Sequence, residues 1–300
     1  MSDYDAIKDK FGAYCSFNEP AANFTTYRTG GAAWALVRPG SRDELGSLWR
    51  WCLEKKRPFC VLGKGSNVLV SDKGFDGVTA LTERLAGIEI SGGYTVKAGA
   101  GVLWDNLVRF CAEKGLGGVE KTSGIPGTVG GAVRMNAGAY GQEIFDRLVS
   151  FEAMDSERRI FTLKKHQIAH GYRNVRGLES LIVLSATFEF YPLGSTELLA
   201  ERARVLVKRA EKQPLDYPSA GSVFKRPVGD YASRLIDVCG LKGLKIGGAQ
   251  VSSKHAGFII NSGGATSADI YRLIRKVQSE VKARTGFELE LEQIMLGDFT

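Results

Sequence analysis

Two glycine-rich segments carry the residue types that bind phosphate groups. The first is VLGKGSNVLV at residues 61–70, where a glycine-rich turn separates two apolar runs. Glycine lets the backbone approach a ligand closely, and successive N–H groups form a concavity that binds anions. Ser66 and Asn67 add side-chain donors. Taken alone, the segment is equally compatible with a phosphate cradle and with an ordinary hairpin turn.

The second segment is SGIPGTVGGAVRMNAGAYG at residues 123–141. It has few charges, and apolar residues such as Ile125, Val129 and Val133 separate its glycines. A flexible linker would not carry these apolar side chains, because they need burial. The mixture predicts a backbone wall against a large flat ligand, with a diphosphate on N–H groups and a ring system on the glycine faces. The alternative is a tightly packed glycine-rich core.

Other nucleotide and metal motifs do not fit. A dinucleotide fingerprint opens a helix, whereas Gly65 is followed by the strand-like run Val68–Val70 and the third glycine is missing. A P-loop requires serine or threonine after its lysine, and Lys64 is followed by glycine. The three histidines form no H-E-x-x-H motif and the five cysteines form no C-x-x-C, so we expect no catalytic metal.

Composition limits the class of protein. The chain has 300 residues, of which 44% are hydrophobic and 24% charged, so it can bury a sizeable core. The net charge is +7, but the basic residues are scattered, which argues against nucleic acid as a partner. No apolar run is long enough for a membrane helix, and the first residues lack the apolar core of a signal peptide. We therefore expect a cytoplasmic protein that is not inserted in a membrane.

The periodicity predicts an α+β fold. Helices are expected to start at Ser41 and end before Pro58, and to span 102–114, 196–212 and 268–284; strands are expected at 59–62, 68–70, 78–81, 88–90, 94–98, 151–154, 159–163, 181–191 and 288–296. The helix over 196–212 is expected to bury Leu199, Ala203, Leu206 and Ala210, and the helix over 268–284 to bury Ile270, Leu273, Ile274, Val277 and Val281. A composition shift near residue 193 predicts a domain boundary there.

The two glycine segments together resemble the UDP-N-acetylenolpyruvoylglucosamine reductases. Further blocks match in order: TYRTGG (26–31), YRN (172–174), AGSVFK (220–225), LIDVCGLKG (235–243), HAGFIIN (255–261) and LELE (289–292). The resemblance spans about residues 22–297. The length is similar to that of a shorter subclass, which lacks an inserted tyrosine-bearing loop.

This resemblance implies an organisation and cofactors. It implies a short N-terminal segment (1–21), a vanillyl-alcohol-oxidase (PCMH)-type FAD-binding region made of two α+β subdomains (22–193), and a smaller C-terminal α+β substrate domain (194–300). It implies FAD, NADPH as reductant and UDP-N-acetylglucosamine enolpyruvate as substrate, with no obligate protein partner evident. Ala32 stands where tethering relatives carry a histidine, so the FAD is expected to be noncovalent. The implied cofactor residues are Gly63, Lys64, Gly65, Ser66, Asn67, Val68, Gly124, Ile125, Gly130, Gly131, Ala132, Asn136, Ala137 and Gly138.

The implied reaction adds hydride and a proton to an enol ether conjugated to a carboxylate. Arg173 matches the residue that would hold the carboxylate, because a guanidinium forks onto two oxygens. Ser222 matches the proton donor, assisted by a cation such as Lys225 or by a water. Glu292 matches the catalytic glutamate and Glu290 is the alternative.

Substrate-binding roles are implied for four further residues, Tyr172, Lys225, Arg226 and His255. The chain departs from the usual family pattern at Leu291 and Gln293, where proline and valine are common, and at Val175, where serine is common. Two other functions remain open at this point: an FAD-dependent oxidase of another alcohol or sugar on the same fold, and a nucleotide-binding protein without catalysis.

Overall fold

The computed structural model describes residues 2–299, which form two compact units. The first unit holds residues up to 16, 35–64 and 77–209, and the second holds 17–34, 65–76 and those from 210 onward. The chain therefore passes between the units five times, including once between Lys64 and Gly65 and once inside α5 (Ser195–Lys212).

This grouping differs from the linear division expected from the sequence, with its limits at residues 21 and 193. Residues 17–34 and 65–76 contribute Tyr27 and Leu69 to the same core as the C-terminal third of the chain. In contrast, residues 194–209 of α5 belong to the first unit. Two N-terminal segments are thus grouped with the C-terminal third of the chain, because Tyr27 and Leu69 are buried in its core.

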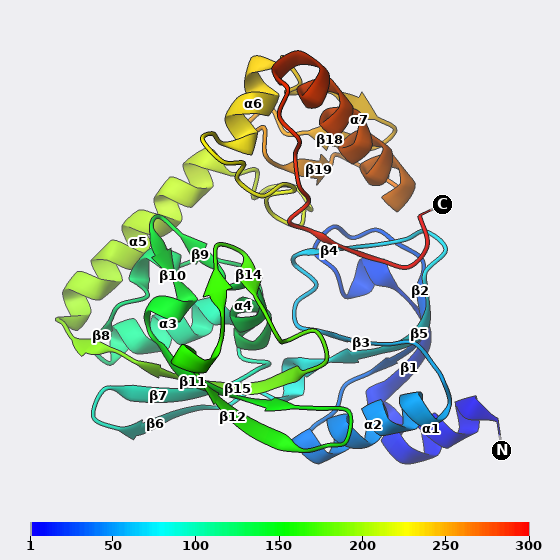
Figure 1. Ribbon diagram of the computed structural model, residues 1–300, viewed down its shortest axis with the longest axis vertical. Helices are drawn as coiled ribbons and strands as arrows, with labels where there is room; N and C mark the ends of the chain where they lie inside the picture. The colour runs from blue at the N-terminus through cyan, green and yellow to red at the C-terminus, as the bar shows by residue number, and fades with distance from the viewer. Residues whose placement is uncertain (1, 300) are drawn as a thin grey trace. The chain divides into compact units, whose positions relative to one another are not determined.

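The first unit is organised around a five-stranded sheet of order β12-β11-β15-β7-β6, in which every neighbouring pair is antiparallel (Figure 1). Its strands are β6 (Ile88–Gly92), β7 (Thr95–Gly99), β11 (Leu148–Met154), β12 (Ile160–Lys164) and β15 (Ile182–Glu189). Helices α3 (Trp104–Glu113) and α4 (Val129–Met135) cover it. Trp104 is fully buried against Phe188, and its indole N–H donates to Thr122 Oγ1 at 2.9 Å.

Residues 3–81 form a four-stranded sheet of order β1-β2-β5-β3 and two α-helices. Its strands are β1 (Cys15–Pro20), β2 (Ala32–Val37), β3 (Phe59–Leu62) and β5 (Phe75–Leu81), and the helices are α1 (Asp3–Phe11) and α2 (Arg42–Glu54). The Ser41 hydroxyl accepts from the Glu44 N–H, so the expected start of α2 is confirmed. The short elements are β8 (Leu116–Gly117), β9 (Gly138–Ala139), β10 (Gln142–Glu143), β13 (His170–Gly171), β14 (Asn174–Val175) and β16 (Tyr191–Pro192).

In the second unit, α7 (Ser267–Thr285) packs on a three-stranded sheet of order β17-β18-β19, and α6 (Ala232–Val238) packs against α7. Its strands are β17 (Lys245–Ile246), β18 (Ala249–Val251) and β19 (Ile259–Asn261). All five residues of the stripe expected on α7 are buried. The strand expected over 288–296 is shorter: only β20 (Ile294–Leu296) pairs regularly, in parallel with β4 (Val68–Val70).

The apolar stripe expected to be buried on α5 is wrong. Leu199, Ala203 and Ala210 are exposed and Leu206 is half-buried, whereas the buried residues are Leu198, Val205 and Arg209. The buried face of α5 contains an arginine because it packs on the backbone of the glycine-rich segment at Gly124. A search for apolar periodicity therefore could not identify this face. Among residues 2–299, no helix combines the length and apolar character needed to cross a membrane.

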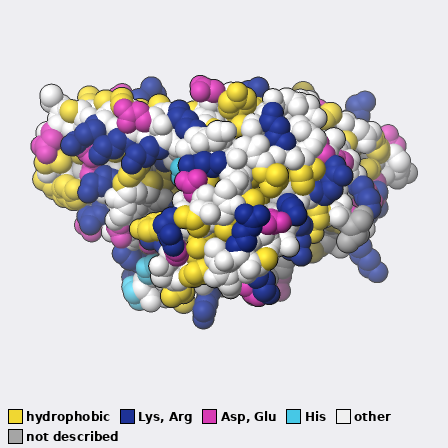
Figure 2. All heavy atoms as spheres, turned by 90° about the horizontal axis from the view of Figure 1, so that it is seen from above, with side chains coloured by type: hydrophobic (Ala, Val, Ile, Leu, Met, Phe, Trp, Pro, Cys, Tyr) yellow, Lys and Arg dark blue, Asp and Glu magenta, His cyan; other side chains and the backbone are white. Residues whose placement is uncertain are grey.

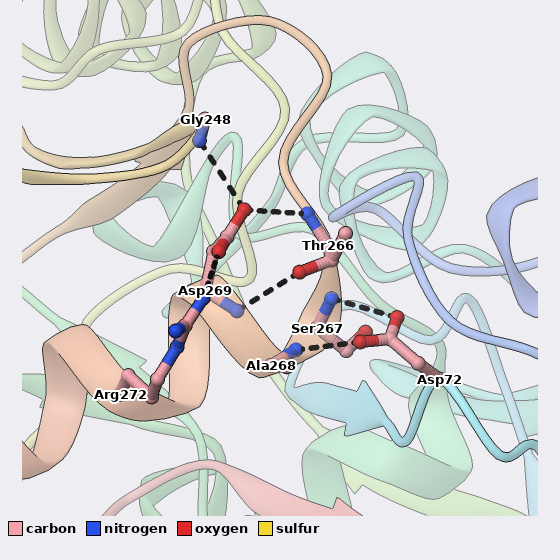
Figure 3. A network of polar contacts seen from close by, with 7 residues as sticks. All are labelled: Asp72, Gly248, Thr266, Ser267, Ala268, Asp269 and Arg272. Atoms are coloured by element: carbon pink, nitrogen blue, oxygen red, sulfur yellow. Dashed lines mark hydrogen bonds and ion pairs between the residues drawn. The ribbon is translucent and has the colours of Figure 1, made fainter.

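A network of polar contacts fixes the start of α7 (Figure 3). Thr266 and Asp269 form a reciprocal capping box, and the Asp269 carboxylate also accepts from the Gly248 N–H. Asp72, just beyond β4, accepts from the N–H groups of Ser267 and Ala268 at 2.9 and 2.8 Å. Helix α7 thus receives a second carboxylate from a segment almost two hundred positions earlier, where the helix dipole favours negative charge.

Replacing Asp72 by alanine should lower the stability of the second unit by about 1–2 kcal/mol, the usual effect of losing a helix cap. Asp72→Asn should lose less, because one acceptor oxygen remains. Urea unfolding followed by circular dichroism would measure both. Asp216→Ala, at an exposed position of the same unit, is the control; an equal loss there would contradict the role given to Asp72.

Candidate active site

In the first unit, Gly63 of the first glycine segment lies against Thr128 of the second. A Cβ at Gly63 would lie 2.2 Å from Oγ1 of Thr128, the residue that caps α4. Glycine is therefore required at this crossing. Strands β3 and β4 belong to different sheets, so the segment between them is not a hairpin turn. Lys64, the last residue of this segment in the first unit, is exposed.

Arg173 is held against the end of the second glycine segment. Its Nη1 donates to the carbonyl of Asn136 at 3.1 Å and its Nη2 to the carbonyl of Gly138 at 2.8 Å. The guanidinium also lies 4.9 Å from the centre of the Tyr172 ring. Arg173 has a φ of +50°, a left-handed conformation that costs free energy in a non-glycine residue. The structure thus brings Tyr172, Arg173, Asn136 and Gly138 together.

Asn136 organises this corner. It ends α4 in the left-handed conformation and is fully buried. Its side-chain N–H₂ group donates to Glu143 Oε2 at 2.7 Å and to the Gly171 carbonyl at 3.0 Å, and its Oδ1 accepts from the Phe145 N–H at 3.2 Å. The Asn136 side chain is therefore engaged in holding the two segments that flank Arg173.

Several backbone N–H groups of the second segment already have protein acceptors. The Gly124 N–H donates to Asp105 Oδ1 at 2.7 Å, and the Gly130 N–H to the Ala100 carbonyl at 2.9 Å. The N–H groups of Ala132 and Ala137 donate within α4 and its cap. Ile125 packs against the core of the unit. Over these positions the expected row of N–H donors is already occupied by protein acceptors, and the Cβ faces of Gly124 and Gly130 also meet protein atoms.

Gly131 provides a test of whether a flat cofactor fits. At Gly130, a Cβ would meet Ala100 Cβ at 2.9 Å, so the protein itself excludes a side chain. At Gly131, which is exposed, the nearest atom to a Cβ would be 3.8 Å away. Glycine in a helix costs about 0.5–1 kcal/mol relative to alanine, and nothing in the protein requires it here. An open glycine face on α4 fits a planar ring at close approach.

In the second unit, hydrogen bonds connect three of the expected segments. The Asn67 side-chain N–H₂ group donates to the Glu292 carbonyl at 3.0 Å, and the Glu292 N–H donates to the Val223 carbonyl at 2.9 Å. Ser222, next to Val223, pairs with Phe258. Ser222, Ser66 and Glu292 are half-buried, and Val68 is buried in β4. A Cβ at Gly65 would lie 2.5 Å from the Phe24 carbonyl oxygen, so this position requires glycine.

Lys225 forms an ion pair with Glu290, whose side chain is 72% exposed. The Lys225 N–H also donates to the Glu290 carbonyl at 2.8 Å. The two acids that the sequence left as alternatives are therefore in different surroundings, because Glu290 is solvated and paired whereas Glu292 is half-buried. Arg226 is exposed and lies 4.7 Å from the centre of the Tyr231 ring.

His255 has an internal role in the structure. Its Nδ1 accepts from the Gly257 N–H at 3.1 Å, and its ring contacts Phe258 edge to face at 4.9 Å. Burial lowers the pKa of His255, and Lys242 adds to this effect. A neutral ring that supports the turn before Phe258 is therefore favoured, and through that turn His255 supports the residue that pairs with Ser222.

Gln293 and Tyr27 are residues that sequence reasoning missed. The buried Gln293 donates from Nε2 to the Ala220 carbonyl at 3.0 Å and accepts from the Tyr27 hydroxyl at 3.0 Å. It therefore fixes the backbone just before Ser222. The available signal was the departure from the common valine at position 293, since a buried amide needs partners.

Comparisons with known proteins now decide the family. The model of the UDP-N-acetylenolpyruvoylglucosamine reductase C-terminal domain matches residues 213–296, and an FAD-binding domain model matches residues 33–164. The reductase of Caldanaerobacter subterraneus subsp. tengcongensis is 43% identical over 283 residues, which cover 94% of this chain and 93% of the relative. The reductase of Lactococcus lactis subsp. cremoris strain SK11 is 42% identical, with 94% of each chain covered.

The chain belongs to the UDP-N-acetylenolpyruvoylglucosamine reductase family. The crystal structure of the reductase from Thermus caldophilus matches with a TM-score of 0.81 at 33% identity, over 93% of this chain and 98% of that one. The expected fold and family are confirmed. As a member of the reductase family, the chain is an oxidoreductase that uses FAD and NADPH.

Stability should fall when the pH is lowered through the titration of His255. The pKa of the folded form lies below the ordinary value of about 6.5, so the unfolded chain binds the proton more readily. This contribution is complete above pH 6.5 and is lost progressively below it. His255→Asn keeps an acceptor for the Gly257 N–H without titrating. Urea unfolding at pH 7.5 and 5.0 should show a smaller pH dependence in the variant; an unchanged dependence would refute this role.

Proposed function

We propose that Arg173, Ser222 and Glu292 carry the reduction of the enolpyruvyl ether of UDP-N-acetylglucosamine to UDP-N-acetylmuramate, the reaction of this reductase family in peptidoglycan precursor synthesis. The observation that most supports this assignment is the Arg173 guanidinium. It is oriented by two backbone carbonyls, on a backbone held at a φ of +50°. We also place the reaction in the cytoplasm, as the family resemblance implies.

FAD, when bound, supplies hydride transfer, from NADPH and then to the terminal carbon of the enolpyruvyl group. The protein has to hold the conjugated carboxylate, stabilise the negative charge that develops on it, and deliver a proton to the adjacent carbon. We assign the cofactor to the residues that the sequence named in both glycine segments, with the open face of Gly131 as the surface for a ring.

Arg173 would bind the substrate carboxylate. The two carbonyl acceptors fix the guanidinium plane, so little reorganisation is needed when charge builds up on the carboxylate. The fork geometry of arginine matches two carboxylate oxygens. Tyr172, beside the guanidinium, limits its movement on one face. Holding growing charge in this way raises the rate as well as the affinity.

Ser222 would donate the proton. A serine hydroxyl is a weak acid in water, so its surroundings have to assist the transfer. The backbone on both sides of Ser222 is fixed: Gln293 holds the Ala220 carbonyl, and the Val223 N–H donates to the Gly257 carbonyl at 2.9 Å. A fixed hydroxyl can be presented to one carbon of the substrate, which is the requirement for selective protonation.

Glu292 is a better candidate than Glu290 for the catalytic acid. Glu290 is exposed and forms an ion pair with Lys225, so its side chain lies in solvent and not in a dry site. Glu292 is half-buried, and its backbone is bonded to the neighbour of Ser222 and to Asn67. The same ion pair reduces the positive charge that Lys225 can offer to Ser222. We retain Lys225, Arg226 and His255 as substrate-domain residues, with His255 acting through its turn.

Anaerobic NADPH oxidation by the purified protein tests the overall reaction. With UDP-N-acetylglucosamine enolpyruvate present, oxidation should continue over many turnovers. Without it, oxidation should stop after one equivalent per bound flavin. A single equivalent in both cases would leave an FAD protein with another electron acceptor, such as an oxidase of a different alcohol or sugar.

Ser222→Ala should separate the two half-reactions. Reduction of the flavin by NADPH should keep its rate, since it needs no proton from Ser222. Reoxidation by the enolpyruvyl substrate should slow by roughly a hundred- to ten-thousandfold, the usual contribution of a general acid. Stopped-flow absorbance at the flavin band measures both steps. An equal loss in both steps would reject Ser222 as the specific proton donor.

Glu292→Gln and Glu290→Gln form a matched pair of variants on the same segment. Glu292→Gln should slow substrate reduction at least about a hundredfold, because it removes the ionisable group from the half-buried position. Glu290→Gln should change the rate less than about threefold, because a solvated ion pair contributes little. Measuring the steady-state kcat of both variants shows which of the two glutamates acts in substrate reduction. A larger loss in Glu290→Gln would reverse the assignment.

A further inference from the structure

Arg209 is a buried cation beside the glycine-rich segment, and the proposed reaction has not used it. Its side chain is 7% exposed, although it lies on a helix whose other charged residues mostly face solvent. A Cβ at Gly124 would lie 3.0 Å from Arg209 Nε and 2.8 Å from Leu206 Cδ2. Leu206 and Arg209 of α5 thus pack directly against the start of the second glycine segment at Gly124.

The carboxylate that acts electrostatically on this guanidinium, that of Asp105, is already engaged. Asp105 on α3 forms an ion pair with Arg202 and accepts the Gly124 N–H at 2.7 Å. Among residues 2–299, the structure shows no hydrogen bond or ion pair for Arg209. Burial lowers the pKa of the Arg209 guanidinium, and Tyr140 and Asp105 oppose this without cancelling it. Arginine nevertheless stays charged in proteins.

An unpaired buried charge is costly. The Arg209 nitrogens keep some contact with solvent, which relieves part of this cost, and a partner of opposite charge would offset the remainder. The charge lies against Gly124, near the start of the segment assigned to the cofactor. An anionic ligand on that segment would supply the missing partner.

We propose that Arg209 is the counter-charge for an anionic group of FAD bound on residues 124–141. The inference rests on the proposed function only in placing FAD on this segment; the use of FAD itself follows from the family. FAD carries negative charge in its diphosphate in both redox states, and in its ring system only after reduction. Both sources present the same chemistry to a guanidinium, namely anionic oxygen or nitrogen acceptors in a poorly solvated site.

The experiment compares Arg209→Gln with the native chain, using Arg204→Gln as a matched control. Arg204 lies on the same helix and is exposed, so its loss should change none of the three measurements. The measurements are the melting temperature of the apoprotein, the dissociation constant of oxidised FAD, and the midpoint potential of the bound flavin.

For the apoprotein, Arg209→Gln should leave the melting temperature unchanged or raise it, because an unpaired charge is removed. The increase in melting temperature should shrink on adding oxidised FAD if Arg209 faces the diphosphate, and on adding reduced FAD if it faces the ring. A side chain with a merely structural role would give the opposite result, a lower melting temperature of the apoprotein with the same increase on adding either oxidised or reduced FAD. That result would overturn the proposal.

The two anionic sources give different results with FAD. If Arg209 faces the diphosphate, oxidised FAD should bind at least tenfold more weakly, with an unchanged midpoint potential. If it faces the reduced ring, binding of oxidised FAD should be unchanged while reduced FAD binds tenfold more weakly, which lowers the potential by about 30 mV for two electrons. If neither quantity moves, Arg209 is not a partner of FAD.

Arg209→Lys keeps the proposal testable if the glutamine variant does not fold. Lysine retains the charge but not the planar fork, so it should recover part of the affinity or potential. Failure of the proposed reaction is separate from failure of this inference. A native chain that binds FAD and is reduced by NADPH, but ignores the enolpyruvyl substrate, would still permit every measurement on Arg209.

Discussion

The left-handed turn at Asn136 is the constraint on which the first unit's site depends. Asn136 ends α4, and its backbone carbonyl accepts one of the two bonds that orient Arg173. Its buried side chain joins α4 to Gly171, two residues before Arg173, and to Glu143 beyond the turn. Both asparagine side-chain atoms are satisfied, so the turn has one stable arrangement. The position of the guanidinium therefore follows from the hydrogen-bonding needs of one amide.

The second unit solves a comparable problem with backbone pairing. The segment that contains Ser222 is too short for a regular strand, yet it is bonded on one side to Gly257 and on the other to Glu292. The Gln293 amide and the Tyr27 hydroxyl complete the support in the unit's interior. Even Lys225, two residues after Val223, is bonded through its own N–H to the Glu290 carbonyl. Local rigidity is thus obtained without long elements.

The sequence predicted well those features that depend on local patterns. The stripe on α7 and the cap of α2 are as expected, because burial of apolar side chains and capping by serine depend on near neighbours. The sequence alone does not distinguish a cradle from a hairpin after β3, because the pairing of β4 with β20 joins positions more than two hundred residues apart. The hydrogen bond between Gln293 and Tyr27 likewise joins positions more than two hundred residues apart, so the sequence does not reveal it.

Arg209 shows a different limit of sequence patterns. Apolar periodicity assigned the buried face of α5 to Leu199, Ala203, Leu206 and Ala210, whereas the helix turns Leu198, Val205 and Arg209 inward. A pattern of apolar residues assumes that the surface beneath a helix is apolar. Here it is a glycine-rich backbone beside a carboxylate, and the rule fails for that physical reason.

The repeated passage of the chain between the two units has a consequence for how the protein is made. Tyr27 and Leu69 belong to the core formed by residues 220–289, so they emerge from the ribosome long before most of their neighbours exist. At usual elongation rates this delay is on the order of tens of seconds. During that time the first unit also lacks α5, which is synthesised after all its other elements. The nascent chain therefore exposes apolar surface for an extended period, and folding of the second unit has to await nearly complete synthesis.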